Sequence, residues 1–248
     1  RSTLFPYTTL FRSGSCFLEL IFPDYCFACK KPGKIICDNC LRSIKLLNKQ
    51  FCPLCEKRQT IQGKICPLCS KQKDFPLDNL IVTANYRDKK LAHAIHLFKY
   101  QFISELATPL GKLMANNLSK NKLVDFDFII PVPLHAKRLR WRGFNQSQLL
   151  ANVIRRQLNT KPLVLDDLIL RHRQTSPQMK IKNHSLRLIN VQNAFVLNRH
   201  YFAKKALLKN KRFLLVDDVC TTGATLVNCA KTLKLLKPKK ISAIILGR

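Results

Sequence analysis

The chain has 248 residues, 46% of them hydrophobic, which is enough to bury the core of one large or two small domains. Its formal net charge of +30 attracts polyanions, above all nucleic acid, as well as phosphorylated small molecules, although solubilising lysines alone would give the same total. No run of about 18 apolar residues occurs, so we expect no transmembrane helix and no membrane insertion.

The first thirteen residues, Arg1 to Ser13, fit nothing downstream. They lack the basic start, the apolar segment and the cleavage site of a signal peptide. They resemble translated sequencing-adapter sequence, so we expect residues 1–15 to be a non-native leader and leave them out of the fold. Without a secretory signal, the sequence favours a cytoplasmic protein.

Eight of the eleven cysteines follow in residues 26–69 as four Cys-x-x-Cys pairs. Each pair makes a tight turn that directs two thiolates at one ion, and two pairs close a tetrahedral Cys₄ zinc site. Disulfides are the alternative, but a reducing compartment favours zinc. The candidate ligands are Cys26, Cys29, Cys37, Cys40, Cys52, Cys55, Cys66 and Cys69.

How these pairs combine is open from spacing alone. Sequential pairing gives two small zinc ribbons, whereas interleaved pairing or a single ion would also satisfy the spacing. A segment this short has little apolar core, so bound zinc would supply much of its folding energy. We assign residues 16–73 to a double zinc ribbon that holds one or two structural ions, with a linker at 74–79.

Strands and helices alternate beyond the linker, in residues 80–248. Strands are expected at 80–86, 126–130, 163–169, 194–197, 213–216 and 241–246, and helices at 91–98, 106–118, 146–158, 225–236 and in a polar segment that ends at Asn190. Such alternation predicts an α/β domain with a mostly parallel sheet flanked by helices.

A basic and aromatic segment lies at residues 135–146, after the Pro-Val-Pro that ends one strand. Its composition suits a mobile loop over a polyphosphate, or a contact with single-stranded nucleic acid in which bases stack on aromatic rings. A solvated basic loop is the simpler alternative. The candidate residues are Arg138, Arg140, Trp141, Arg142 and Phe144.

The strand at 213–216 leads into two adjacent carboxylates, Asp217 and Asp218, and then into a small hydroxyl-rich loop that opens a helix. Such a loop offers N–H groups, hydroxyls and a favourable dipole end to a phosphate, and Gly223 permits close backbone approach. The carboxylates can accept hydrogen bonds from sugar hydroxyls or help to hold a hydrated Mg²⁺. The segment therefore points to a phosphorylated pentose, although two solvated aspartates before a capped helix would look similar.

Residues 216–225 (Val-Asp-Asp-Val-Cys-Thr-Thr-Gly-Ala-Thr) resemble the phosphoribosyl-pyrophosphate (PRPP) signature of type I phosphoribosyltransferases. The resemblance implies that the acidic pair holds the ribose hydroxyls and that the loop cradles the 5′-phosphate, with Mg²⁺ bound alongside PRPP. It also makes Lys99 a candidate pyrophosphate contact, where a surface lysine is the alternative. The implied PRPP-binding residues of the loop are Thr221, Thr222, Gly223, Ala224 and Thr225.

The chain further resembles the ComF family of competence-associated phosphoribosyltransferase-like proteins over about residues 16–248. The matching segments are Pro-Val-Pro-Leu at 131–134, Arg-Gly-Phe-Asn-Gln at 142–146 and a middle stretch from Arg171 to Phe195, together with the cysteine pairs. The spacing from Gln178 to Arg187 is one residue longer than the family pattern, which leaves the roles in that stretch in doubt.

Two functions follow from this resemblance. One is a phosphoribosyltransferase with an unknown acceptor, in which PRPP, Mg²⁺ and basic side chains serve a reaction at the anomeric carbon and no protein nucleophile is needed. The other is a non-catalytic protein that binds single-stranded DNA or docks a partner and keeps the fold as a scaffold or sensor. The family implies work on transforming DNA, with helicase or recombination proteins as partners.

Overall fold

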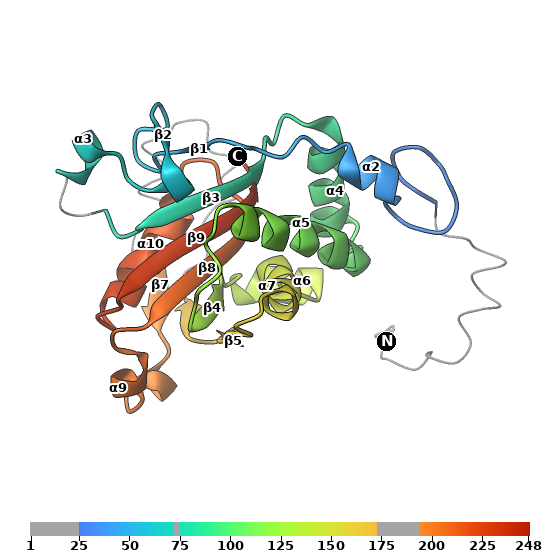
Figure 1. Ribbon diagram of the computed structural model, residues 1–248. Helices are drawn as coiled ribbons and strands as arrows, with labels where there is room; N and C mark the ends of the chain where they lie inside the picture. The colour runs from blue at the N-terminus through green and yellow to red at the C-terminus, as the bar shows by residue number, and fades with distance from the viewer. Residues whose placement is uncertain (1–24, 72–74, 173–193) are drawn as a thin grey trace, which may run out of the picture. The chain divides into compact units, whose positions relative to one another are not determined.

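The computed structural model describes residues 25–71, 75–172 and 194–248, so the leader and the expected helix before Asn190 lie outside the described residues. The chain divides into two compact units between Ser43 and Ile44. The smaller unit contains the first two cysteine pairs and a short helix, α2 (Asp38–Arg42). The larger unit contains the other two pairs and the α/β domain (Figure 1).

A parallel five-stranded sheet with the order β3-β9-β8-β4-β5 forms the centre of the larger unit. In the register, Val216 and Ile81 both lie beside Ile244, and Pro131 lies beside Val216. Most residues of the neighbouring strands β8 and β9 are buried on both faces of the sheet, as expected for strands covered by helices on each side. The strands are β3 (Asn79–Ala84), β4 (Phe128–Pro131), β5 (Leu163–Val164), β8 (Arg212–Val219) and β9 (Lys240–Gly247).

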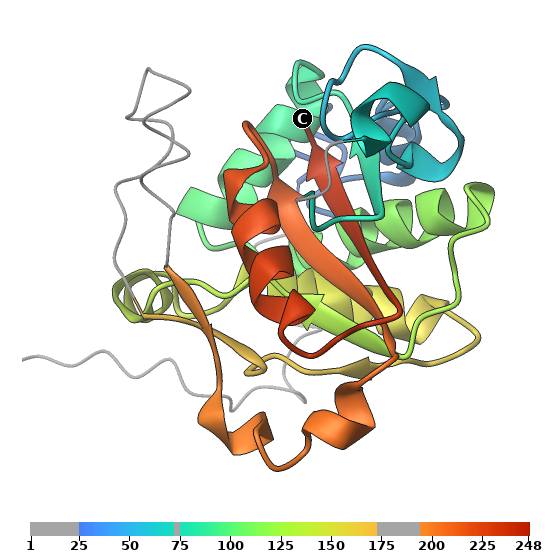
Figure 2. The same ribbon diagram turned by 90° about the vertical axis from the view of Figure 1, so that its left-hand side faces the viewer.

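Helices cover both faces of this sheet, which confirms the α/β prediction. Figure 2 shows α10 in front of the sheet, with α5 and α7 on its far side. Gly111 of α5 lies so close to Val153 of α7 that a Cβ at this glycine would be 2.6 Å from the valine Cβ. The main helices are α4 (Lys89–Tyr100), α5 (Ala107–Lys120), α7 (Gln146–Gln157) and α10 (Ala224–Lys234), and the short ones are α3 (Pro67–Ser70) and α9 (Lys205–Leu208).

The second cysteine module belongs to the larger unit, whereas sequence analysis grouped it with the first. Its small antiparallel sheet, β1 (Gln50–Phe51) and β2 (Gln59–Thr60), lies beside the edge strand β3. The buried Gln50 amide donates to the Val82 carbonyl (3.0 Å) and accepts from the Val82 N–H (2.9 Å), as a backbone unit would. Gly63 (φ +61°) approaches Leu80 so closely that a Cβ would overlap its carbonyl.

The strand expected at 163–169 is wrong, because the segment splits into β5 and a separate strand, β6 (Ile169–Arg171). β6 pairs antiparallel with β7 (Phe195–Leu197), and this pair packs against α10. The break falls at Asp166 and Asp167, which are exposed and accept hydrogen bonds from Gln148 and from Tyr201. Two adjacent ionised carboxylates cannot be buried in the middle of a sheet without partners, so the strand ends there.

The basic segment at 135–146 contains a helix, α6 (Ala136–Arg142), where sequence analysis expected a mobile loop. His135 caps its first turn by accepting a hydrogen bond from the Lys137 N–H (3.2 Å). Gly143 ends it in the left-handed conformation (φ +80°), which glycine adopts at little cost. Alanine, leucine and arginine between these caps all favour helix, and this local signal explains the difference.

Candidate functional site

The acidic pair lies at the carboxyl end of β8, where parallel sheets place their ligand sites. Ser147, in the first turn of α7, donates a hydrogen bond from its hydroxyl to Asp217 Oδ1 (3.0 Å). Lys99, near the end of α4, forms an ion pair with Asp218, with 2.8 Å between Nζ and Oδ1. Three elements that are distant in the sequence therefore meet at the two carboxylates.

These contacts tie each carboxylate to a fixed neighbour. Asp217 accepts a further hydrogen bond from the Asp218 N–H (2.9 Å), and Asp218 accepts one from the Val219 N–H (2.6 Å). Burial and the adjacent Asp218 charge raise the pKa of Asp217 to about 7, against the opposing effects of Lys99 and the Ser147 hydroxyl. Asp217 therefore keeps its proton to a higher pH than an ordinary aspartate does, and a nearby cation would favour its ionised form.

The hydroxyl-rich loop joins this carboxyl end of β8 to α10. Gly223 takes a left-handed conformation (φ +77°), and α10 begins at the next residue. Thr222 Oγ1 accepts a hydrogen bond from the Ala224 N–H (3.4 Å), which folds the loop back on the start of the helix. The backbone N–H groups of the first helical turn and the positive end of the helix dipole thus lie where a phosphate would bind.

Two arginines, Arg142 and Arg171, interact electrostatically with the acidic pair, and the Arg138 charge lies close to both of them. Burial lowers the pKa of Arg142. The Asp218 carboxylate opposes this shift, and the Arg138 charge adds to it. Burial also lowers the pKa of Arg171, on β6; the Arg138 charge reinforces that shift and Asp217 opposes it. A cluster of guanidinium groups beside two carboxylates suits a polyphosphate that arrives with a divalent cation.

The candidate residues around α6 do not form one surface. Arg140 and Trp141 are exposed, whereas Arg142 is half-buried and donates to the Gln146 side chain (2.6 Å). Phe144 is half-buried and packs on the fully buried Phe98 of α4, with ring centroids 5.7 Å apart. Phe144 therefore serves packing, and Trp141 is the ring that α6 presents to solvent.

Sequence analysis missed Ser147 and did not include Arg171 among the site residues. Asn145 caps α7 by accepting from the Ser147 N–H (3.1 Å), and its own amide donates to the Val132 carbonyl (3.0 Å). This cap fixes the first turn of α7 against the end of β4 and so aims Ser147 at Asp217. An Asn-x-Ser at the start of an amphipathic helix is the local signal, but only the fold shows which carboxylate the serine meets.

The eight clustered cysteines form two groups, each built from sequential pairs. Their sulfur atoms all lie within 4.8 Å of one another in each group, and the pairing is 26/29 with 37/40 and 52/55 with 66/69. A tetrahedral zinc with Zn–S bonds of about 2.3 Å needs sulfurs about 3.8 Å apart. The measured separations are 3.6 Å between Cys29 and Cys37, and 3.9 Å between Cys55 and Cys66, so the donor sets fit zinc.

Backbone N–H groups donate to a cysteine sulfur in each group. The Cys37 N–H donates to Cys26 Sγ (3.4 Å), and the Cys66 N–H donates to Cys52 Sγ (3.3 Å). Hydrogen bonds from the backbone of Lys57 and Arg58 lower the pKa of Cys55 to about 6. Thiolates held in this way are ready metal ligands.

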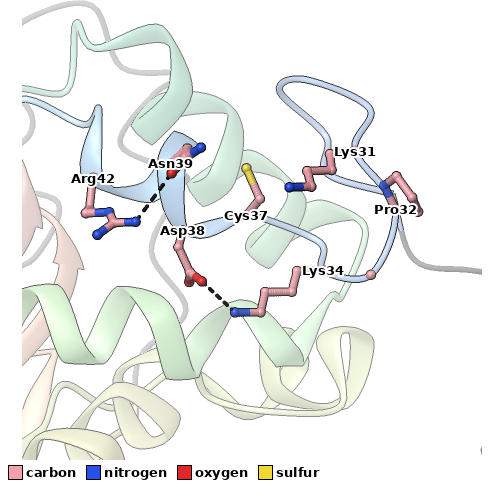
Figure 3. Close-up of a pocket in the computed structure, with 8 residues that line it drawn as sticks. Lys31, Pro32, Lys34, Cys37, Asp38, Asn39 and Arg42 are labelled. Atoms are coloured by element: carbon pink, nitrogen blue, oxygen red, sulfur yellow. Dashed lines mark hydrogen bonds and ion pairs between the residues drawn. The ribbon is translucent and has the colours of Figure 1, made fainter.

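A basic pocket of about 260 Å³ adjoins the first cysteine group. As Figure 3 shows, Lys34 forms an ion pair with Asp38 (2.8 Å), and Arg42 donates to the Asn39 side chain (3.3 Å). Of the three cations that line the pocket, Lys34 and Arg42 are thus paired with side chains of the short helix α2.

The α/β sheet and the acidic pair followed by a glycine-containing loop define a phosphoribosyltransferase-type protein. The family described as "Phosphoribosyl transferase domain" matches residues 145–247, which include α7, β8, the loop and α10. None of the described helices combines the length and apolar character that a membrane span requires.

Known relatives specify the family. The chain is 31% identical over 222 residues to "DNA utilization protein YhgH" of Escherichia coli, covering 86% of this chain and 92% of that protein. It is 30% identical over 223 residues to "Competence protein F" of Haemophilus influenzae (86% and 90%), and 26% identical over 208 residues to "Competence protein ComFC" of Bacillus subtilis (82% and 79%). The chain belongs to the ComF family.

Proposed function

We propose that this protein binds PRPP with Mg²⁺ at the end of β8 and acts in the uptake or processing of transforming single-stranded DNA. The observation that supports PRPP most strongly is the Asp217–Asp218 pair, held by Lys99 and Ser147 beside the loop that opens α10. The names of the relatives support the link to competence and DNA use.

Each group of site residues would contact a different part of PRPP. The two carboxylates would accept hydrogen bonds from the ribose 2′- and 3′-hydroxyls, and the loop from Thr221 to Thr225 would surround the 5′-phosphate. Lys99 would move from Asp218 to the pyrophosphate, where Arg142 and Arg171 add positive charge. Bound Mg²⁺ would offset the charge of the leaving pyrophosphate, so a nitrogen acceptor could displace it from the anomeric carbon.

Calorimetric titration of PRPP in the presence of Mg²⁺ tests this site. The wild-type protein should bind PRPP, and the double variant Asp217→Asn/Asp218→Asn should lose binding. Asp166→Asn/Asp167→Asn is the matched control, because it removes an adjacent, exposed aspartate pair from the same unit. Equal affinity in the wild type and the site variant would overturn the assignment.

A non-catalytic protein that binds single-stranded DNA or docks a partner is the second candidate. The net charge of +30 and the exposed Trp141 among the arginines of α6 favour it. Incubation with PRPP, Mg²⁺ and candidate acceptors, followed by assay of released pyrophosphate, separates the two. Release of pyrophosphate only in the presence of an acceptor supports an enzyme, and PRPP binding without release supports a sensor or scaffold. For either function, we propose that the protein works in the cytoplasm with helicase or recombination proteins.

A further inference from the structure

Three exposed aromatic rings from two separate elements meet beside the candidate PRPP site. Tyr100 is the last residue of α4, Phe102 follows two residues later, and Trp141 lies on α6; they are 42%, 39% and 59% exposed. The Trp141 centroid is 5.1 Å from that of Phe102 and 6.4 Å from that of Tyr100, and both pairs meet edge to face. The rings form one cluster and still present much of their surface to water.

The backbone at Phe102 is unusual for an exposed aromatic residue. Its φ is +58°, and the N–H groups on both sides of it, at Gln101 and Ile103, donate to the Leu97 carbonyl at the end of α4. Glycine normally occupies such a position, because side chains disfavour the left-handed conformation. Among the described non-glycine residues with positive φ, Phe102 is the one aromatic residue, and the rest are polar or charged. The strain places its ring against Trp141.

One cation lies against two of the rings. The Arg142 guanidinium lies 5.8 Å from the Tyr100 centroid and 5.9 Å from the Trp141 centroid, and the Gln146 side chain holds it there. The rest of α6 adds Lys137, Arg138 and Arg140 and contains no carboxylate. Flat apolar faces bordered by positive charge match the alternation of bases and phosphates in a single nucleic-acid strand, whereas an apolar peptide would gain nothing from these cations.

We propose that Tyr100, Phe102 and Trp141 form a stacking platform for bases of single-stranded DNA, with the cations of α6 contacting its phosphates. This inference rests on the proposed role in DNA handling, and it adds the place and mode of binding. The strand lies next to the PRPP site, since Tyr100 directly follows Lys99. A duplex cannot use the platform, because its bases are already stacked.

The chain offers a direct probe, because Trp141 is its only tryptophan. Titration with the unlabelled oligonucleotide dT20 should quench its fluorescence as a base stacks on the indole, and the same length of duplex should not. In parallel, fluorescence anisotropy of labelled dT20 should show affinity reduced about tenfold or more in Trp141→Ala. Phe202→Ala is the matched control, since Phe202 is 50% exposed with Lys205 above its ring (4.7 Å) elsewhere in the same unit.

Phe102→Gly separates binding from folding. Glycine fits the left-handed backbone, so the melting temperature should stay equal or rise, while the affinity for dT20 falls several-fold. If the wild type binds dT20 but its fluorescence is unchanged, and if Trp141→Ala and Phe102→Gly bind like the wild type, the platform is overturned and the role in DNA handling stands. If the wild type does not bind dT20, both are overturned.

Discussion

Folding favours the protonated form of the Asp217 carboxyl group, whereas the proposed ligand binding favours its ionised form. Its carboxyl group is drawn into the sheet edge beside a second carboxylate, and its pKa rises from the usual 3.8 to about 7. The unfolded chain would release this proton near pH 4. The ligand-free folded protein therefore favours the protonated form of Asp217 at a pH where the unfolded chain has lost the proton, whereas the proposed binding of Mg²⁺ would favour the ionised form.

Replacement of Asp217 by asparagine should stabilise the ligand-free protein in a pH-dependent way. A raised carboxyl pKa contributes stability below pH 4 that is lost as the pH rises through 7, and asparagine cannot ionise. A pKa difference of about 3 corresponds to about 4 kcal/mol, so we expect a gain of up to about 4 kcal/mol at pH 8 that shrinks as the pH falls toward 4. Urea denaturation from pH 4 to 8 measures it, with Asp166→Asn as the exposed control; a gain that does not vary with pH would contradict the assignment.

Lys99 can be separated from an ordinary surface lysine by its contact with Asp218. The alternative left open by the sequence predicts no effect on a ligand, whereas the ion pair of 2.8 Å places the ammonium group at the site. Lys99→Met should weaken PRPP binding about tenfold or more, because it removes one charge-assisted contact. Lys89→Met, at the exposed start of the same helix, should bind PRPP like the wild type in the same calorimetric titration.

At the scale of elements, the second cysteine module is joined to the sheet by a side chain that imitates a strand. Gln50 meets the outer edge of β3 with both atoms of its amide, so an edge that would otherwise be open to water is partly paired. Gly63 brings the backbone of the module against Leu80, which no larger residue permits without a shift. The module therefore completes the edge of the larger unit.

Replacement of Gln50 by alanine should lower the free energy of unfolding by more than the same replacement of an exposed glutamine. In Gln50→Ala the partly buried Val82 N–H loses its acceptor and the Val82 carbonyl loses a donor, which together should cost about 1 kcal/mol or more. Gln59→Ala, an exposed position on the neighbouring β2, should change the free energy of unfolding by less than about 0.5 kcal/mol. Urea denaturation of both variants decides between them, and equal stability would show that the module does not support the sheet.

Local signals account for which elements could be predicted from the sequence. Continuous apolar runs predicted β8 and β9, and helical periodicity predicted α4, α5, α7 and α10. The prediction of one strand at 163–169 was wrong because it followed the apolar residues of the segment and neglected Asp166 and Asp167. These carboxylates cannot be buried in a sheet, so the strand ends before them. The prediction for segment 135–146 failed because its charge suggested a loop, although Gly143 is a common residue at the end of a helix.

The site was predictable in part, for a related reason. The acidic pair and its loop are contiguous, so one strand, one turn and one helix reveal them together. Ser147 and Gln50 act across the fold on partners 70 and 32 residues away, and no local pattern indicates such pairs. The three proposed platform rings likewise come from the end of α4, from the residues that follow it and from α6, so the sequence indicated Trp141 but not the rings beside it.

On the scale of the whole molecule, the charge of +30 would attract DNA to much of the surface, so local contacts must be distinguished from this background. Affinity for dT20 should fall about tenfold or more between 50 and 200 mM salt if three or more phosphates are contacted. Arg140→Gln should make the slope of log affinity against log salt shallower by about 0.7. Arg155→Gln, exposed on α7, should leave the slope unchanged, and equal slopes in all three proteins would show that Arg140 contacts no phosphate.

The end of α4 carries Lys99 toward the carboxylates and Tyr100 toward the exposed rings, within one turn of helix. PRPP and a DNA strand, bound as proposed, would therefore contact the same short segment of backbone. A ligand that moved this segment would change the contacts of the other ligand. For the two ligands proposed above, any coupling would be reciprocal: the factor by which PRPP changed the affinity for a DNA strand would equal the factor by which the strand changed the affinity for PRPP.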